Sequence, residues 1–140
     1  MKRFISVFLV VFMLFLMVGC DKVIPKTEYQ INEEAILDNI KLKLVSAEHL
    51  ENDVIEMVFS ITNERDNTIT LSPDTNFKFY DINQVQIPNQ YTANKSILKS
   101  KETVSYTLQY TTNKEIYEIL FYSGIVENNI KFTFTSLDMK

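Results

Sequence analysis

The sequence of 140 residues predicts an all-β protein, and we expect a two-layer antiparallel β-sandwich of about seven strands. Apolar side chains alternate with polar ones in several short segments, as they do in strands that bury one face. Turn-forming residues separate those segments at the spacing of an all-β domain. The chain has only 2 glycines, and Asn and Asp replace glycine in the turns because both tolerate left-handed backbone.

The predicted strands follow one another from Glu33 onward. Strict alternation identifies segments 40–44, 55–61, 104–110 and 130–134. Shorter candidates lie at 68–71, 77–80 and 84–87, and residues 115–122 form a denser apolar strand. The turns between them read NERDN, SPDTN, DINQ, TTNK and ENN. A helix competes with a strand only around residues 36–47, where apolar residues also recur at helical spacing, but the alternation in ILKLKL favours the strand.

The inward faces of these strands should form the core between the two sheets. The chain contains no Trp, so the Cys–Trp–Cys core of antibody domains is absent and the sandwich is Ig-like in architecture only. The expected core residues are Leu42, Leu44, Met57, Phe59, Ile61, Phe77, Phe79, Leu108, Ile119, Phe121, Phe132 and Phe134.

The N-terminus has the parts of a secretory signal peptide. Lys2 and Arg3 precede an apolar run over residues 4–18 that only Ser6 interrupts, and Gly19 follows. As a helix, fifteen residues would reach about 23 Å, which is short of the roughly 30 Å hydrocarbon core of a bilayer. A cleaved signal over residues 1–19 is therefore favoured over a permanent transmembrane helix.

The single cysteine follows this run directly. Met17-Val18-Gly19-Cys20 resembles a bacterial lipobox, with Met where Leu is usual. The resemblance implies that the Cys20 thiol takes a diacylglyceryl group and that Cys20 becomes the first mature residue. Two acyl chains anchor a protein stably where one does so only marginally. We expect residues 20–32 to be the lipidated cysteine and a tether, residues 33–140 to be the sandwich domain, and the protein to lie on the extracytoplasmic face of the cell membrane.

The charge balance narrows the choice of partners. The chain carries 14 basic and 18 acidic side chains, and loss of Lys2 and Arg3 with the signal leaves a formal charge of −6. Nucleic-acid binding needs a basic surface, so this balance argues against it. No disulfide is available, because the mature chain has no cysteine beyond the anchor. The expected partners are membrane lipid through Cys20 and a protein at the cell surface.

Three longer segments carry a family resemblance. They are INEEAILDNIKLKLVSAEH, VIEMVFSITNERDNTITLSPDTNFKFYDINQVQIPN and LKSKETVSYTLQYTTNKEIYEILF. Together they resemble the Ig-like domain of unknown function common in secreted and lipid-anchored proteins of Gram-positive bacteria, over about residues 31–135. Ser100 and Lys101 stand where that family usually has Pro-Gly. The resemblance implies an Ig-like sandwich and no catalytic or ligand-binding residues.

The sequence offers little support for catalysis. His49 is the only histidine, so a Ser–His or Cys–His pair and a zinc site all lack ligands or partners. The carboxylates Glu48, Glu51, Asp53 and Glu56 lie close in sequence, but such a run is usually a solvated face. We therefore expect a non-enzymatic protein with no cofactor, no metal site and no catalytic residues.

One strand suggests a contact surface. In segment 115–122, Tyr117, Ile119 and Phe121 should face inward, which leaves the apolar Ile116, Leu120 and Tyr122 on the opposite face. We expect these last three to form a partner-docking patch or to lie under a loop or the tether.

The sequence as a whole predicts a lipid-anchored extracytoplasmic binding module. The alternatives are an immunity or inhibitory lipoprotein of a mobile element and, with less support, a wall-directed hydrolase.

Overall fold

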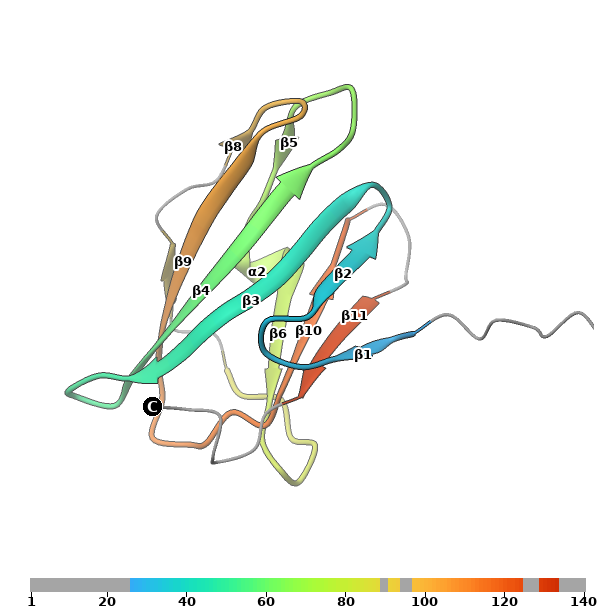
Figure 1. The fold of residues 1–140 in the computed structure, drawn as a ribbon. Coiled ribbons are helices and arrows are strands. Elements are labelled where there is room, and N and C mark those ends of the chain that lie inside the picture. The colour runs from blue at the N-terminus through green and yellow to red at the C-terminus, as the bar shows by residue number, and fades with distance from the viewer. Residues whose placement is uncertain (1–25, 89–90, 94–96, 125–128, 134–140) are drawn as a thin grey trace, which may run out of the picture.

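The protein is a β-sandwich, as predicted (Figure 1). The computed structural model describes residues 26–88, 91–93, 97–124 and 129–133. Sheet A has the strand order β1 (Glu28–Tyr29), β11 (Asn129–Thr133), β10 (Glu118–Tyr122), β6 (Phe77–Tyr80). Sheet B has the order β2 (Glu34–Leu37), β3 (Ile40–His49), β4 (Val54–Asn63), β9 (Thr103–Thr111), β7 (Tyr91–Ala93). A separate pair joins β5 (Ile69–Thr70) to β8 (Ile97–Leu98), and one helical turn, α2 (Pro73–Asn76), precedes β6.

Residues 36–47, for which the sequence allowed a helix or a strand, lie in a β-hairpin. β2 and β3 pair antiparallel around Asp38 and Asn39, whose φ angles are 49° and 59°. A two-residue loop with two positive φ angles matches the right-handed twist of the flanking strands, and Asp and Asn are among the residues that adopt it. β2 itself was not predicted, because its four residues are too short for alternation to stand out.

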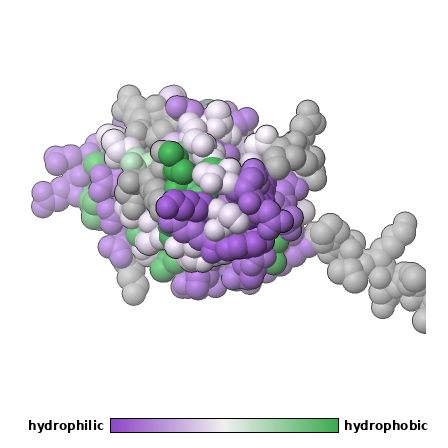
Figure 2. All heavy atoms as spheres, turned by 90° about the horizontal axis from the view of Figure 1, so that it is seen from above, coloured by the Kyte–Doolittle hydropathy of each residue, from purple (hydrophilic) through white to green (hydrophobic). Residues whose placement is uncertain are grey.

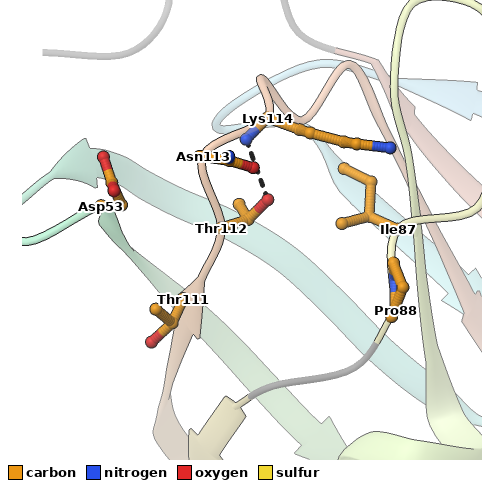
Figure 3. A pocket seen from close by; sticks show the side chains of 7 residues that line it. All are labelled: Asp53, Ile87, Pro88, Thr111, Thr112, Asn113 and Lys114. Carbon is orange, nitrogen blue, oxygen red and sulfur yellow. Dashed lines mark hydrogen bonds between the residues drawn. The ribbon is translucent and has the colours of Figure 1, made fainter.

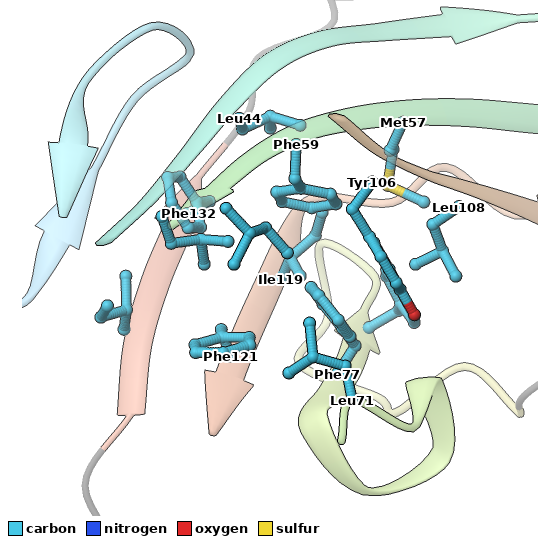
Figure 4. Packing of buried hydrophobic residues seen from close by; sticks show 14 of the residues in the cluster. Leu44, Met57, Phe59, Leu71, Phe77, Tyr106, Leu108, Ile119, Phe121 and Phe132 are labelled. Carbon is cyan, nitrogen blue, oxygen red and sulfur yellow. The ribbon is translucent and has the colours of Figure 1, made fainter. Parts of the chain in front are cut away.

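The core lies between the inner faces of the two sheets (Figure 4). Phe59 of sheet B packs against Phe77 and Phe132 of sheet A, with ring centroids 5.2 and 6.2 Å apart. Eleven of the twelve expected core residues are buried, and Phe134 lies outside the described residues. Tyr106 and Tyr110 join the core as its two largest fully buried side chains.

One predicted strand is wrong, and two short strands of the structure were not predicted. Residues 84–87 are not a strand: Gln84 has a φ of 60°, and the chain makes only an isolated bridge between Tyr80 and Gln86. A closed turn forms there instead, because the Asp81 carboxylate accepts hydrogen bonds from the backbone N–H groups of Asn83 and Val85 at 2.9 and 3.0 Å. The short strands β7 and β8 were not predicted from the sequence.

The expected tether contributes a strand to the domain. Within the predicted tether 20–32, β1 pairs in parallel with β11, so the sandwich is not wholly antiparallel. The Tyr29 ring packs 6.1 Å from that of Phe132, and the Asn32 N–H donates to the Leu44 carbonyl at 2.8 Å. Two residues are too few to show an alternating pattern, so the sequence did not predict this strand.

Candidate functional site

Different loops lie at the two ends of the sandwich. β10 starts beside β6's last residue, since Glu118 pairs with Tyr80, and β4 starts beside β9's last residue, since Val54 pairs with Thr111. The loops 50–53, 81–88 and 112–117 therefore gather at one end, which we call the loop end. β1 lies on the edge of sheet A and runs parallel to β11, toward the loop end (Figure 1). We call the end opposite the loop end, where β4 ends and β9 starts, the entry end.

The loop end contains a pocket of about 460 Å³ (Figure 3). That volume falls in the range of small-ligand sites. Three segments distant in the sequence contribute to it: the β3–β4 turn, the chain after β6 and the chain after β9. The lining residues are Asp53, Ile87, Pro88, Thr111, Thr112, Asn113 and Lys114.

Hydrogen bonds hold the walls of the pocket in place. The Thr112 N–H donates to the Asp53 carbonyl and the Ile87 N–H to the Phe79 carbonyl, each at 2.8 Å. The Tyr110 hydroxyl donates to the Pro88 carbonyl, which fastens that wall to sheet B. Burial raises the pKa of Tyr110 to about 12, so the hydroxyl keeps its proton for this bond at neutral pH. The walls are thus formed before any ligand arrives.

The polar side of the pocket is a short turn that offers hydrogen-bond donors. The Lys114 N–H donates to Thr112 Oγ1 at 3.0 Å, which leaves the Thr112 hydroxyl proton unused by that contact (Figure 3). The side chains of Asn113 and Lys114 are exposed, and neither has a partner among the described residues. This turn was predicted as TTNK, but its role as a pocket wall was not, because the other walls come from distant segments.

Exposed apolar side chains lie in the same loops. Ile82 is 72% exposed, Val85 51% and Tyr117 37%. The Tyr117 N–H donates to the Tyr80 carbonyl at 2.9 Å, and this bond places Tyr117 beside the 81–85 turn. Figure 2 shows the molecule from the opposite end, where hydrophilic and neutral residues cover most of the surface around a small apolar area.

The predicted docking patch is corrected at Ile116. This residue is only 3% exposed and belongs to the core, whereas Tyr117, expected to face inward, is exposed. The reason is that β10 begins only at Glu118, so the alternation of the strand does not extend back to residues 116 and 117. Leu120 and Tyr122 do lie on the outer face of sheet A, and both are half-buried.

Charged residues surround Leu120 and Tyr122. Leu120 pairs with Lys78 of β6 on one side and Lys131 of β11 on the other. The Lys78 ammonium lies 4.9 Å from the centroid of the Tyr122 ring. The Lys131 ammonium pairs with the carboxylate of the buried Glu118 at 2.8 Å. This face is therefore a mixed surface of apolar and ion-paired groups and not a continuous apolar patch.

Cys20, the predicted lipid site, lies outside the described residues. His49 is exposed at the end of β3. Of the nearby carboxylates, Glu56 accepts a hydrogen bond from the Gln109 amide at 2.8 Å, and across the sheet it pairs with Glu48.

The described residues contain neither a cluster of metal ligands nor a helix that could span a bilayer. Three or more His, Cys, Asp or Glu side chains never come together there as metal ligands would. In the same part of the chain, no helix is both long and apolar enough to span a bilayer.

Comparison with known proteins places the fold. No family model and no curated protein matches the chain. The structure is similar to the yjhA protein from Bacillus subtilis, with a TM-score of 0.61 and 12% identity over 76% of this chain and 99% of that one. It is also similar to the secreted protein MPT63 from Mycobacterium tuberculosis, with a TM-score of 0.57 and 9% identity over 79% of this chain and 99% of that one.

An uncharacterized β-sandwich protein from Clostridium difficile 630 is similar as well, with a TM-score of 0.51 and 11% identity over 79% of this chain and 95% of that one. At identities this low, all these similarities establish the β-sandwich fold and nothing about function.

Proposed function

We propose that this protein is a lipid-anchored, non-catalytic binding module that faces the extracytoplasmic side of the cell membrane and presents its loop end to a ligand or partner. The lipobox-like sequence that ends in Cys20 supports the anchor. The fold is consistent with this location, because one structure of similar fold is described as a secreted protein. A binding role fits the pocket, whose lining combines polar donors with an apolar wall.

The observation that carries the proposal is the position of β1. β1 runs parallel to β11, toward the loop end, so the chain comes to it from the direction away from the pocket. Only five residues separate Cys20 from Lys26, and the six Cα-to-Cα steps between the two residues span at most about 20 Å when fully extended. A lipid at Cys20 would therefore hold the entry end close to the bilayer.

The length of the sheets then sets the position of the pocket. β9 runs from the entry end to the pocket over 9 residues, which corresponds to about 30 Å of extended strand. The anchor would therefore direct the pocket away from the membrane, toward whatever lies outside the cell membrane.

A labelling experiment tests this orientation. The variant Asn113→Cys places a thiol at the exposed rim of the pocket, and Asn67→Cys places one at the exposed entry end as a matched control. In intact cells from which the wall has been removed, a bulky membrane-impermeant maleimide should label Asn113→Cys at least several-fold faster than Asn67→Cys. The two rates should become equal after the protein is extracted in detergent.

Fractionation tests the anchor separately. Cys20→Ala should move the protein out of the membrane fraction or leave an unprocessed precursor. A processed Cys20→Ala protein that remains membrane-bound would rule out lipidation, and Asn113→Cys that reacts only after cell lysis would rule out the extracytoplasmic location.

A further inference from the structure

We infer that the pocket binds a small organic carboxylate, with the carboxylate on the 112–114 turn and an apolar body against Ile87 and Pro88. This inference rests on the proposed binding function and names the chemistry of the ligand. Three features of the pocket support it: the hydrogen-bond donors of the turn, the apolar wall and the position of the one carboxylate that lines the pocket.

The 112–114 turn supplies donors without protein acceptors. The ammonium of Lys114 can only donate, and it has no ion-pair partner among the described residues. Thr112 Oγ1 accepts the Lys114 N–H, and its own proton remains available for donation to a ligand. The Asn113 amide adds two N–H donors on an exposed side chain. A group of donors around one cation suits an oxyanion, and hydrogen bonds that involve charged partners are the stronger kind.

The opposite wall selects an apolar body over a bare inorganic anion. Ile87 is 2% exposed and is fixed by its backbone bond to Phe79, while Pro88 is exposed beside it. In Figure 3 the aliphatic part of Lys114 extends across the pocket toward Ile87. A ligand that places its carboxylate at Lys114 would therefore rest its apolar part on Pro88, above the buried Ile87, and removal of the exposed Pro88 surface from water favours binding.

The one acidic residue of the pocket does not neutralise this arrangement. Asp53 lies on the far side of the pocket from the Lys114 side chain, and its carboxylate points away from Ile87 (Figure 3). Asp53 therefore does not pair with the Lys114 ammonium, which can meet an anion although the mature chain as a whole carries a formal charge of −6. The Asp53 side should tolerate hydroxyl or amide donors on the ligand rather than a second carboxylate.

Two sources outside a cell share this chemistry: the C-terminus of a short peptide with small apolar side chains, and a carboxylated amino sugar. N-acetyl-valyl-alanine and N-acetylmuramic acid are suitable probes of the two, and N-acetyl-valyl-alanine amide is the uncharged match of the first. The full-length chain, labelled at its isoleucine methyl groups and held in detergent, reports binding through the Ile87 methyl signal. Inorganic phosphate serves as an anion without an apolar body.

We expect at least one of the two acids to shift the Ile87 signal in a saturable way. N-acetyl-valyl-alanine amide and phosphate should bind at least ten-fold more weakly than the better acid. Lys114→Gln should weaken the better acid at least ten-fold. Lys101→Gln, which removes the same charge from an exposed lysine at the entry end, should change its affinity less than two-fold. The better acid identifies the source of the ligand.

The inference is wrong if neither acid shifts Ile87, if amide and acid bind equally, or if Lys114→Gln binds as the unaltered protein does. Equal binding by phosphate would overturn the role of the apolar wall. None of these results bears on the orientation of the domain, because the labelling rates and the membrane fractionation test the proposed function without any ligand.

Discussion

We expect the hydroxyl group of Tyr106 to lower the free energy of unfolding of the protein. Its side chain is fully buried and stacks on Phe77 with ring centroids 5.8 Å apart, but its hydroxyl has no hydrogen-bond partner among the described residues. Burying a hydroxyl without a partner costs about 1–3 kcal/mol. Tyr106→Phe keeps the ring and removes the cost, so we expect the free energy of unfolding to rise by about 1–2 kcal/mol.

Tyr110 provides the matched control. It is also fully buried and packs on Phe79 with ring centroids 4.6 Å apart, but its hydroxyl donates to the Pro88 carbonyl. Tyr110→Phe removes the same atom and breaks that bond, so the free energy of unfolding should fall by about 1 kcal/mol. Urea denaturation followed by circular dichroism measures both changes, and two variants that shift in the same direction would refute the reasoning.

The pH dependence gives a second test of the same atoms. Burial raises the pKa of Tyr106 to about 12 from its usual value of 10.0. The unfolded chain therefore releases this proton first as the pH rises, and the folded protein loses stability between pH 10 and 12. Tyr106→Phe cannot ionise, so its advantage over the unaltered protein should grow across that range. An advantage that stays constant from pH 9 to 12 would show that Tyr106 is not buried as described.

Other perturbations test the core, one buried amide and one ion pair. Phe59→Ala should lower the free energy of unfolding by about 3–5 kcal/mol in urea denaturation, because the ring is fully buried between the sheets; a loss under 1 kcal/mol would contradict its place there. The buried Asn63 amide donates to the Asn67 and Lys99 carbonyls at 2.8 and 3.1 Å, so Asn63→Ala should cost about 2–3 kcal/mol by the same assay. Hydrogen bonding to Glu118 and then Glu28 raises the pKa of Lys131 above its ordinary value of 10.5. Its stabilising effect should therefore be present below pH 10.5 and be lost as the pH rises above that value, and Lys131→Gln should remove that alkaline loss.

The periodicity of the sequence was sufficient to predict the sandwich and most of its core. In β3, β4 and β9, every second side chain is apolar over residues 40–44, 55–61 and 104–110, and a strand with one buried face requires that pattern. The alternation therefore identified both the strands and the side chains that face inward. The lipobox-like segment is likewise a local signal, since it depends on consecutive residues and needs no folded partner.

Local periodicity could not predict where short elements begin or which segments meet. The burial of Ile116 depends on the start of β10 at Glu118, and β1 exists because β11 offers an edge to two residues of the expected tether. The pocket depends on contacts between residues far apart in the chain, such as the 2.8 Å bond between Thr112 and Asp53.

The sequence by itself therefore determined the fold class, the core and the anchor signal, because each is encoded by residues close together in the chain. Only the tertiary structure decided the edge strand β1 and the pocket, because these follow from the order in which the strands pair.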